Sequence, residues 1–154
     1  MSNTMTLRTD NIAVIMSIYK NDKLEYIKDA INSICQQENI IPLILIYVDG
    51  IIPKQEFEYL ECLHKQHIIE LIHSEYNRGL SFALNALIDK VLMYPHIEYI
   101  ARMDSDDISL PRRLEKQKQF MDIHTEIDIL GTACEEFGTS YALVEKNYLL
   151  SIQN

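Results

Sequence analysis

The chain has 154 residues, of which 47% are hydrophobic, and it carries a formal net charge of −9 at pH 7. This length and composition favour one domain with a substantial core, and the acidic balance argues against nonspecific nucleic-acid binding, which needs a basic face. Three cysteines without close pairing fit a reduced, cytoplasmic setting. Residues 1–11 form a polar N-terminal tail without the apolar core of a signal peptide. The longest apolar run, residues 40–48, is too short to cross a bilayer.

Along the first half of the chain, continuous apolar runs alternate with segments in which apolar residues recur at helical spacing. Residues 12–18 are a continuous apolar run, which is typical of a strand buried on both faces. The spacing of apolar residues predicts an amphipathic helix over about 23–37. A second strand is predicted over 43–48 and a second helix over about 53–67, which begins at a proline.

The second half continues this alternation. We predict a strand over 68–73, a loop over 77–79, a helix from 80 to the residue before Pro95, a strand over 98–103, a helix over about 112–122 and a strand over 127–133. The order of strands and helices predicts an α/β fold whose sheet is mostly parallel and carries helices on both faces. In such sheets, ligands bind at the carboxyl ends of the strands.

Three carboxylates follow the strand predicted over 98–103. They are Asp104, Asp106 and Asp107. Acids this close repel one another unless a cation or a set of hydrogen-bond donors compensates, and hard divalent cations prefer carboxylate oxygens. An Asp-x-Asp pattern at a strand end is therefore a candidate metal–phosphate site. The plainer interpretation is a solvated turn that caps the next helix. An EF-hand is excluded because Ser109 occupies the position that needs glycine.

Two other predicted strands also end in distinctive residues. Ser17 and Tyr19 lie at the end of the first strand, and Asp49 lies at the end of the second. This fold class brings such strand ends to one edge of the sheet, together with Asp104 and Asp106. The convergence is stronger evidence for a ligand site than any single motif. Taken alone, Tyr19 is explained equally well by packing as by ligand binding. Asp49 is explained equally well by a turn that it forms with the glycine after it.

Other polar residues favour plain structural roles. His64 and His67 are spaced like a metal pair, but they lie on a charged predicted helix without a third ligand. That arrangement favours a solvated helix face. Arg112 and Arg113 are interpreted as surface charges at a helix start rather than as phosphate ligands.

Four segments together resemble family 2 glycosyltransferases with the GT-A fold, a Rossmann-like arrangement. They are residues 14–19, 48–50, 77–85 and 101–113. Asp-x-Asp alone is a weak signal, but all four segments in the family's order are a strong one. The likeness covers residues 12–134 and corresponds to the N-terminal, nucleotide-sugar-binding portion of that family. Residues 135–154 remain unassigned.

The resemblance implies a UDP-sugar donor, Mn²⁺ or Mg²⁺ on its diphosphate, and inversion at the sugar carbon. Asp49 would contact the uracil, and Asp106 would ligate the metal. The full set of nucleotide-binding residues that it implies is Ser17, Tyr19, Asp49, Asn77, Asn85, Asp104 and Ser105, with Asp104 and Asp106 as metal ligands. The roles of Asn77 and Asn85 follow less directly from the resemblance, because an ordinary position in a turn or on a helix surface would also explain these residues.

The resemblance also implies an acceptor half that we do not find. The family's general base lies well downstream of Asp-x-Asp, often within a Glu-Asp pair, whereas Glu135-Glu136 comes too early and the chain has no tryptophan. We therefore expect the chain to be truncated before the acceptor half and to give no sugar transfer alone. The implied acceptor is a saccharide or a lipid-linked saccharide of bacterial surface-polysaccharide synthesis. Peripheral association with the inner face of the membrane and self-association remain open.

Two alternative functions follow from the same residues. One is a noncatalytic remnant that binds a nucleotide sugar but does not transfer it. The other is a nucleotidyltransferase with a similar sheet, which would need a glycine-rich, basic phosphate loop after the first strand. Residues 17–22 contain no glycine, which counts against it.

Overall fold

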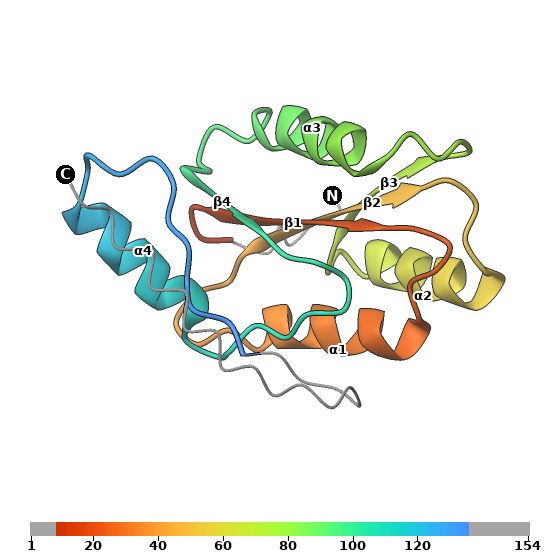
Figure 1. The fold of residues 1–154 in the computed structure, drawn as a ribbon, viewed down its shortest axis with the longest axis horizontal. Coiled ribbons are helices and arrows are strands. Elements are labelled where there is room, and N and C mark those ends of the chain that lie inside the picture. Colours follow the sequence, from red (N-terminus) through yellow and green to blue (C-terminus); the bar gives the residue numbers. More distant parts are fainter. Residues whose placement is uncertain (1–8, 136–154) are drawn as a thin grey trace, which may run out of the picture. The chain divides into compact units, whose positions relative to one another are not determined.

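The computed structural model describes residues 9–135. Its elements are β1 (Ile12–Ile18), α1 (Leu24–Cys35), β2 (Leu43–Asp49), α2 (Lys54–Lys65), β3 (Glu70–Ser74), α3 (Leu80–Val91), β4 (Tyr99–Arg102) and α4 (Arg113–Ile123) (Figure 1). The chain divides into two compact units, Met1–Glu115 and Lys116–Asn154, and the sheet belongs to the first. The predicted order of strands and helices is confirmed through α4, with bounds that differ by a few residues.

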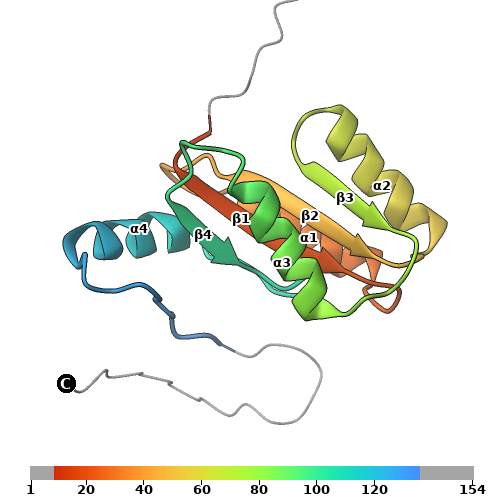
Figure 2. The same ribbon diagram turned by 90° about the horizontal axis from the view of Figure 1, so that it is seen from above.

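The four strands form one parallel sheet in the order β3-β2-β1-β4 (Figure 2). Strand β1 pairs in parallel with β2 on one side and with β4 on the other. Strand β2 pairs in parallel with β3. This confirms the predicted α/β fold with a parallel sheet, and it makes β1 the central strand of the part described.

Helices cover both faces of the sheet. Figure 1 shows α1 and α2 on one face and α3 on the other. Alternate residues of β1 belong to two separate apolar clusters. One cluster contains Val14, Met16 and Ile18 with Ile27, Ile31 and Ile34 of α1; the other contains Ala13 and Ile15 with Ala83, Leu87 and Val91 of α3. Because both faces of β1 are covered, the strand reads in sequence as a continuous apolar run.

The prediction of a strand over 127–133 is wrong. These residues form no strand, and Ile129 is 85% exposed. A strand needs a hydrogen-bonded neighbour, and the part of the chain that the structure describes supplies none for this segment. A short apolar run predicts burial, but it does not supply the partner that would pair with it.

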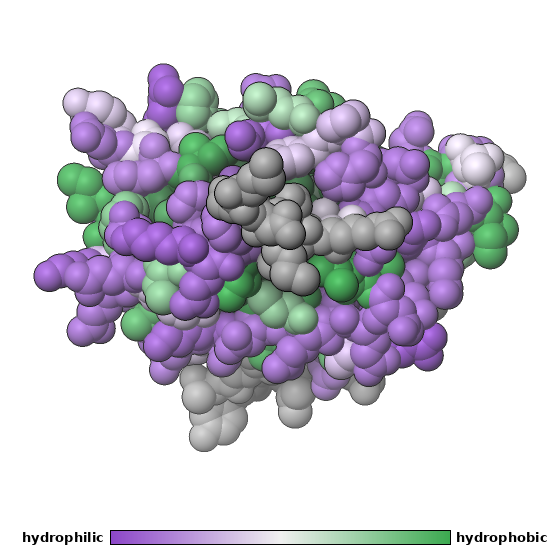
Figure 3. Space-filling model, turned by 180° about the vertical axis from the view of Figure 1, so that it is seen from behind, coloured by the Kyte–Doolittle hydropathy of each residue, from purple (hydrophilic) through white to green (hydrophobic). Residues whose placement is uncertain are grey.

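Figure 3 shows a face on which hydrophilic residues predominate and hydrophobic residues form separate small patches. Within residues 9–135, no helix has both the length and the apolar character that crossing a membrane requires.

Replacing Ile46 in β2 by alanine should lower the free energy of unfolding by about 2–5 kcal/mol, because the substitution removes buried methyl groups and leaves a cavity. The Ile46 side chain is fully buried. The matched control is Ile51→Ala, at a side chain that is 77% exposed, which should change stability by less than about 0.5 kcal/mol. Urea unfolding followed by circular dichroism measures both. Equal effects at the two positions would contradict the observed core.

Candidate functional site

The carboxyl ends of three strands lie next to one another at one edge of the sheet (Figure 2). Strand β2 ends at Asp49, β1 ends just after Ser17, and β4 leads into Asp104. Because β1 lies between β2 and β4, the candidate residues follow one another along this edge in a fixed order. Asp49 comes first, then Ser17 and Tyr19, then the acidic loop, defined here as residues 104–107. The structure therefore places most of the predicted site residues on one edge.

Asp49 joins β2 to the loop that precedes α3. Its side chain is only 3% exposed. Oδ1 accepts the backbone N–H of Arg78 at 2.7 Å, and Oδ2 accepts that of Gly79 at 2.9 Å. The side-chain amide of Asn77 donates to the Asp49 carbonyl at 3.3 Å. The carboxylate thus lies at the start of α3, where the helix dipole favours a negative charge. The bond from Asn77 to the Asp49 carbonyl places Asn77 at the same edge.

Gly50 allows this close approach. Its φ is +91°, in the left-handed region that side chains disfavour. A Cβ atom at this position would lie 3.0 Å from the backbone nitrogen of Asn77. The turn after β2 therefore needs glycine for two reasons, which are its backbone conformation and the contact with the loop before α3.

The turn after β1 contains a residue that sequence reasoning missed. The Tyr19 backbone N–H donates to Asp22 Oδ2 at 2.9 Å, and the Asp22 N–H donates to the Tyr19 carbonyl at 3.0 Å. The Ser105 side chain opposes the rise that burial causes in the pKa of Asp22. Tyr19 is 41% exposed and Ser17 is half-buried. The signal for Asp22 in the sequence was a carboxylate in the turn that follows the first strand.

The acidic loop exposes its carboxylates and buries its serine. Ser105 is 6% exposed, whereas Asp104, Asp106 and Asp107 are exposed. Asp104 Oδ1 accepts a hydrogen bond from Arg102 Nη2 at 2.8 Å, and both side chains of this ion pair are about half exposed. An ion pair this accessible to water contributes little to stability, so it does not prevent Asp104 from binding another cation.

Four carboxylates at this end of the edge repel one another electrostatically. Burial raises the pKa of Asp22, and the charges of Asp106 and Asp104 raise it further. Partial desolvation raises the pKa of Asp107 although the residue is exposed, and the charges of Asp104 and Asp106 raise it further. These carboxylates are close enough to disfavour one another's charge, which is the condition that a bound cation relieves.

Polar groups of α1 and the residue that follows its C-cap hold the chain that leaves the acidic loop. Gln37 Nε2 donates to Ser109 Oγ at 3.0 Å and to the Leu110 carbonyl at 2.9 Å, and Gln37 Oε1 accepts the Leu114 N–H at 3.0 Å. Ser33 Oγ accepts the Ser109 N–H at 2.9 Å. Sequence reasoning missed these contacts, although two polar residues at core-facing helical spacing were a signal for them.

Arg112 and Arg113 differ in their surroundings. Arg112 is exposed and its Nε pairs with Glu115 Oε2 at 2.8 Å, in agreement with a surface charge. Arg113 is only partly exposed, and its Nε and Nη2 atoms are buried without a hydrogen-bond partner among the described residues. Burial lowers the pKa of Arg113, and the nearby Asp107 opposes that shift. The prediction of a surface charge is therefore wrong for Arg113.

The donor set fits a metal that shares its coordination with a substrate. Within residues 9–135, no group of three or more His, Cys, Asp or Glu side chains could hold a metal ion. Mg²⁺ is usually bound by one or two carboxylates together with substrate phosphates and water, and Asp104 and Asp106 are exposed carboxylates of the kind that such a site uses. Within the described residues, His64 and His67 belong to no such group either.

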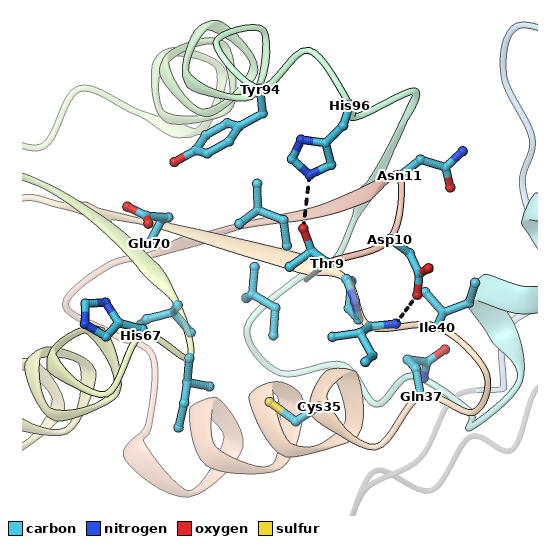
Figure 4. Close-up of a pocket in the computed structure, with 16 residues that line it drawn as sticks. Thr9, Asp10, Asn11, Cys35, Gln37, Ile40, His67, Glu70, Tyr94 and His96 are labelled. Atoms are coloured by element: carbon cyan, nitrogen blue, oxygen red, sulfur yellow. Dashed lines mark hydrogen bonds between the residues drawn. The ribbon is translucent and has the colours of Figure 1, made fainter. Parts of the chain in front are cut away.

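Two features lie outside this set of contacts. Asn85 is exposed in the second turn of α3, and the hydrogen bonds described above do not include it. A cavity of about 1030 Å³ lies at the amino ends of β1, β2 and β3, at the opposite edge of the sheet. Figure 4 shows Glu70, Tyr94 and His96 around it, with His96 hydrogen-bonded to Thr9. None of the residues predicted for the site lines this cavity.

Comparison with known sequences supports the resemblance seen in the sequence. The model of the family described as glycosyl transferase family 2 matches residues 13–146. The O-antigen biosynthesis glycosyltransferase WbnJ of Escherichia coli is 39% identical over 133 residues, which are 83% of this chain and 48% of that protein. The chain spans about half the length of this relative, of the glycosyltransferase AmsE of Erwinia amylovora and of an uncharacterized glycosyltransferase of Haemophilus influenzae, both of which it also matches.

Comparison with solved structures identifies the fold as α/β and GT-A-like. Residues 1–349 of Staphylococcus aureus TarS, in complex with UDP-GlcNAc, match with a TM-score of 0.62 at 21% identity. The match covers 75% of this chain and 32% of that one. The mannosyltransferase PcManGT of Pyrobaculum calidifontis, in complex with GDP-Man and Mn²⁺, matches with a TM-score of 0.51 at 16% identity, over 67% of this chain and 29% of that one. At these identities the likeness concerns the fold alone.

Proposed function

Because the chain belongs to glycosyl transferase family 2, we propose that it binds a UDP-sugar at the carboxyl edge of its sheet and serves the transfer of that sugar to a saccharide acceptor. A relative in bacterial O-antigen biosynthesis supports a role in surface-polysaccharide synthesis. The proposal includes inversion at the sugar carbon, a lipid-linked saccharide as an alternative acceptor, and a cytoplasmic location at the inner face of the membrane.

The observation that carries the proposal is the order of residues along the edge. Asp49 lies at one end, Ser17 and Tyr19 in the middle, and the acidic loop at the other end. Neighbouring strands lie about 4.8 Å apart, so β2 and β4 are separated by about 10 Å. A nucleoside diphosphate is an elongated molecule that suits this order, with its base at Asp49, its ribose over β1 and its phosphates at Asp104 and Asp106.

Each proposed residue suits the part of the ligand that it faces. The nucleotide contacts are Ser17, Tyr19, Asp49, Asn77, Asn85, Asp104 and Ser105, and the metal ligands are Asp104 and Asp106. Carboxylate oxygens are the ligands that Mg²⁺ and Mn²⁺ prefer. When bound, such an ion would neutralise the charge of the diphosphate leaving group. A TarS structure contains UDP-GlcNAc and the PcManGT structure contains Mn²⁺, which supports this choice of donor and metal.

UDP should bind more tightly in the presence of Mn²⁺ or Mg²⁺, and Asp106→Ala should remove most of that gain, because one hard ligand and one negative charge are lost. Isothermal calorimetry with and without metal measures both effects. The control is Asp89→Ala, at an exposed aspartate of α3, which should retain the metal effect. Equal UDP affinity with and without metal in the parent protein would contradict the proposed metal site.

Uracil should be preferred over other bases, and Asp49→Asn should weaken UDP binding by about 10–100-fold, the equivalent of one charge-assisted hydrogen bond of roughly 1.5–3 kcal/mol. Asp49 already accepts two backbone N–H groups, so the amide also perturbs the loop before α3. Calorimetry with UDP and with GDP separates the two effects. A mutant that is less stable but keeps the parent's ratio of UDP to GDP affinity would show that Asp49 acts only in the turn.

Residues 1–154 alone should give no acceptor-dependent sugar transfer, because we assign no general base within them. General-base catalysis contributes about 10²–10⁴-fold, and positioning of the acceptor contributes further. Release of UDP from a UDP-sugar, measured with and without a saccharide acceptor, tests this, and slow hydrolysis of the donor is compatible with the expectation. Robust transfer that depends on the acceptor would overturn it and would make Glu135 or Glu136 the candidate base.

A further inference from the structure

The acidic loop forms a turn that is joined to the sheet on its upstream side. The Asp107 N–H donates to the Asp104 carbonyl at 3.3 Å, which closes residues 104–107 into a turn. Immediately before it, the N–H of the buried Met103 donates to the Ile15 carbonyl of β1 at 3.1 Å. The sheet therefore fixes the place at which the chain enters the loop.

The downstream side of the loop is joined to α1. Only Ile108 separates the turn from Ser109, which is 5% exposed. The Ser109 N–H donates to Ser33 Oγ at 2.9 Å, and Ser109 Oγ accepts from Gln37 Nε2 at 3.0 Å. Figure 1 shows the segment between β4 and α4 running alongside α1. Because one residue lies between the turn and these contacts, they restrict where the turn can lie.

Gln37 holds most of the exit segment, defined here as residues 108–114. Its side chain is 8% exposed. Beyond Ser109, Nε2 donates to the Leu110 carbonyl at 2.9 Å, and Oε1 accepts the Leu114 N–H at 3.0 Å. The donor and the acceptor of one amide thus bind different parts of the exit segment.

A buried amide does something here that an apolar side chain of the same size would not. Burial of a polar group costs free energy unless its hydrogen bonds are made, so filling the core alone would favour an apolar residue. Apolar contacts are non-directional, whereas hydrogen bonds weaken steeply with angle. A buried polar network that is satisfied therefore rigidifies and specifies one arrangement. The contribution of Gln37 beyond burial is a defined path for the exit segment.

We propose that Gln37 is a positioning residue for the candidate metal site: it fixes the path by which the chain leaves the acidic loop and so holds Asp104 and Asp106 in place at the edge of the sheet. This inference rests on the proposed function, in which these two carboxylates share a metal ion with a diphosphate. Gln37 itself is assigned neither to the metal nor to the nucleotide. It acts through the exit segment.

The test measures the metal gain, which is the ratio of UDP affinity with Mn²⁺ to UDP affinity without it, by calorimetry. Gln37→Met keeps a long unbranched side chain but removes the amide, and it should lower the metal gain by about 3–10-fold, the equivalent of roughly one net hydrogen bond. UDP affinity without metal should stay within about twofold of the parent, because Asp49 lies at the other end of the edge. Ser109→Ala removes one of the same contacts, so the loss in the double variant should be smaller than the product of the single losses.

Two controls separate positioning from loss of stability. Gln66→Met makes the same substitution at the exposed C-cap of α2, and Leu60→Ala destabilises the core under α2; both should keep the parent's metal gain. Thermal unfolding shows which variants are folded, and Ser109→Ala takes the place of Gln37→Met if the latter does not fold. An unchanged metal gain in the folded variant would overturn the proposal. An equal loss of UDP affinity with and without Mn²⁺ would also overturn it.

Hydrogen exchange distinguishes failure of this inference from failure of the proposed function. If the parent protein shows no metal gain, the proposed function fails, but the restraint on the loop can still be measured. Gln37→Met should accelerate exchange of the Leu114 N–H, which loses its acceptor, and also of the Asp107 N–H within the acidic loop. Faster exchange at Leu114 with unchanged exchange at Asp107 would show that Gln37 supports only the exit segment, and it would overturn the positioning role independently of any ligand.

Discussion

The parallel pairing of β1 with both β2 and β4 is the constraint on which the candidate site depends. Strand β1 takes this central place because both of its faces are apolar and both are covered, by α1 on one side and α3 on the other. Parallel neighbours must end at the same edge, so the residues that follow β1, β2 and β4 meet there without any contact of their own having to bring them together. The core therefore determines which strand ends are neighbours, and the site follows from that order.

Polar contacts then determine how the acidic loop lies at this edge. Ser33 and Gln37 bind the segment that leaves the loop. A buried amide left without partners costs about 1–3 kcal/mol, whereas each satisfied hydrogen bond contributes only about 1 kcal/mol net. The Gln37 NH2 group donates to the Ser33 carbonyl within α1 as well, but Oε1 accepts from Leu114 and the other donated bonds go to Ser109 and Leu110, so these contacts favour a path of the chain along α1. The carboxylates of the loop are left exposed and mutually repelling.

Asp49 combines two requirements at the other end of the edge. Its two backbone donors offset its burial, since a buried polar group costs free energy unless it is hydrogen-bonded. A carboxylate has about four acceptor positions, so two backbone donors do not exhaust it. The structural role in the turn and the proposed contact with a base are therefore compatible.

The sequence by itself determined the succession of strands and helices, because periodicity reports directly which faces are buried. The continuous apolar run over 12–18 predicted a strand covered on both faces, and the acids after β4 were visible as a cluster at a strand end. Periodicity carries no information about partners, however. The apolar run over 127–133 predicted a strand that has no neighbour to pair with among the described residues. The contacts of Gln37 with Leu114 and of Asp49 with Gly79, and the burial of Arg113, were decided only by the tertiary structure, because they join residues far apart in the chain or depend on what packs around them.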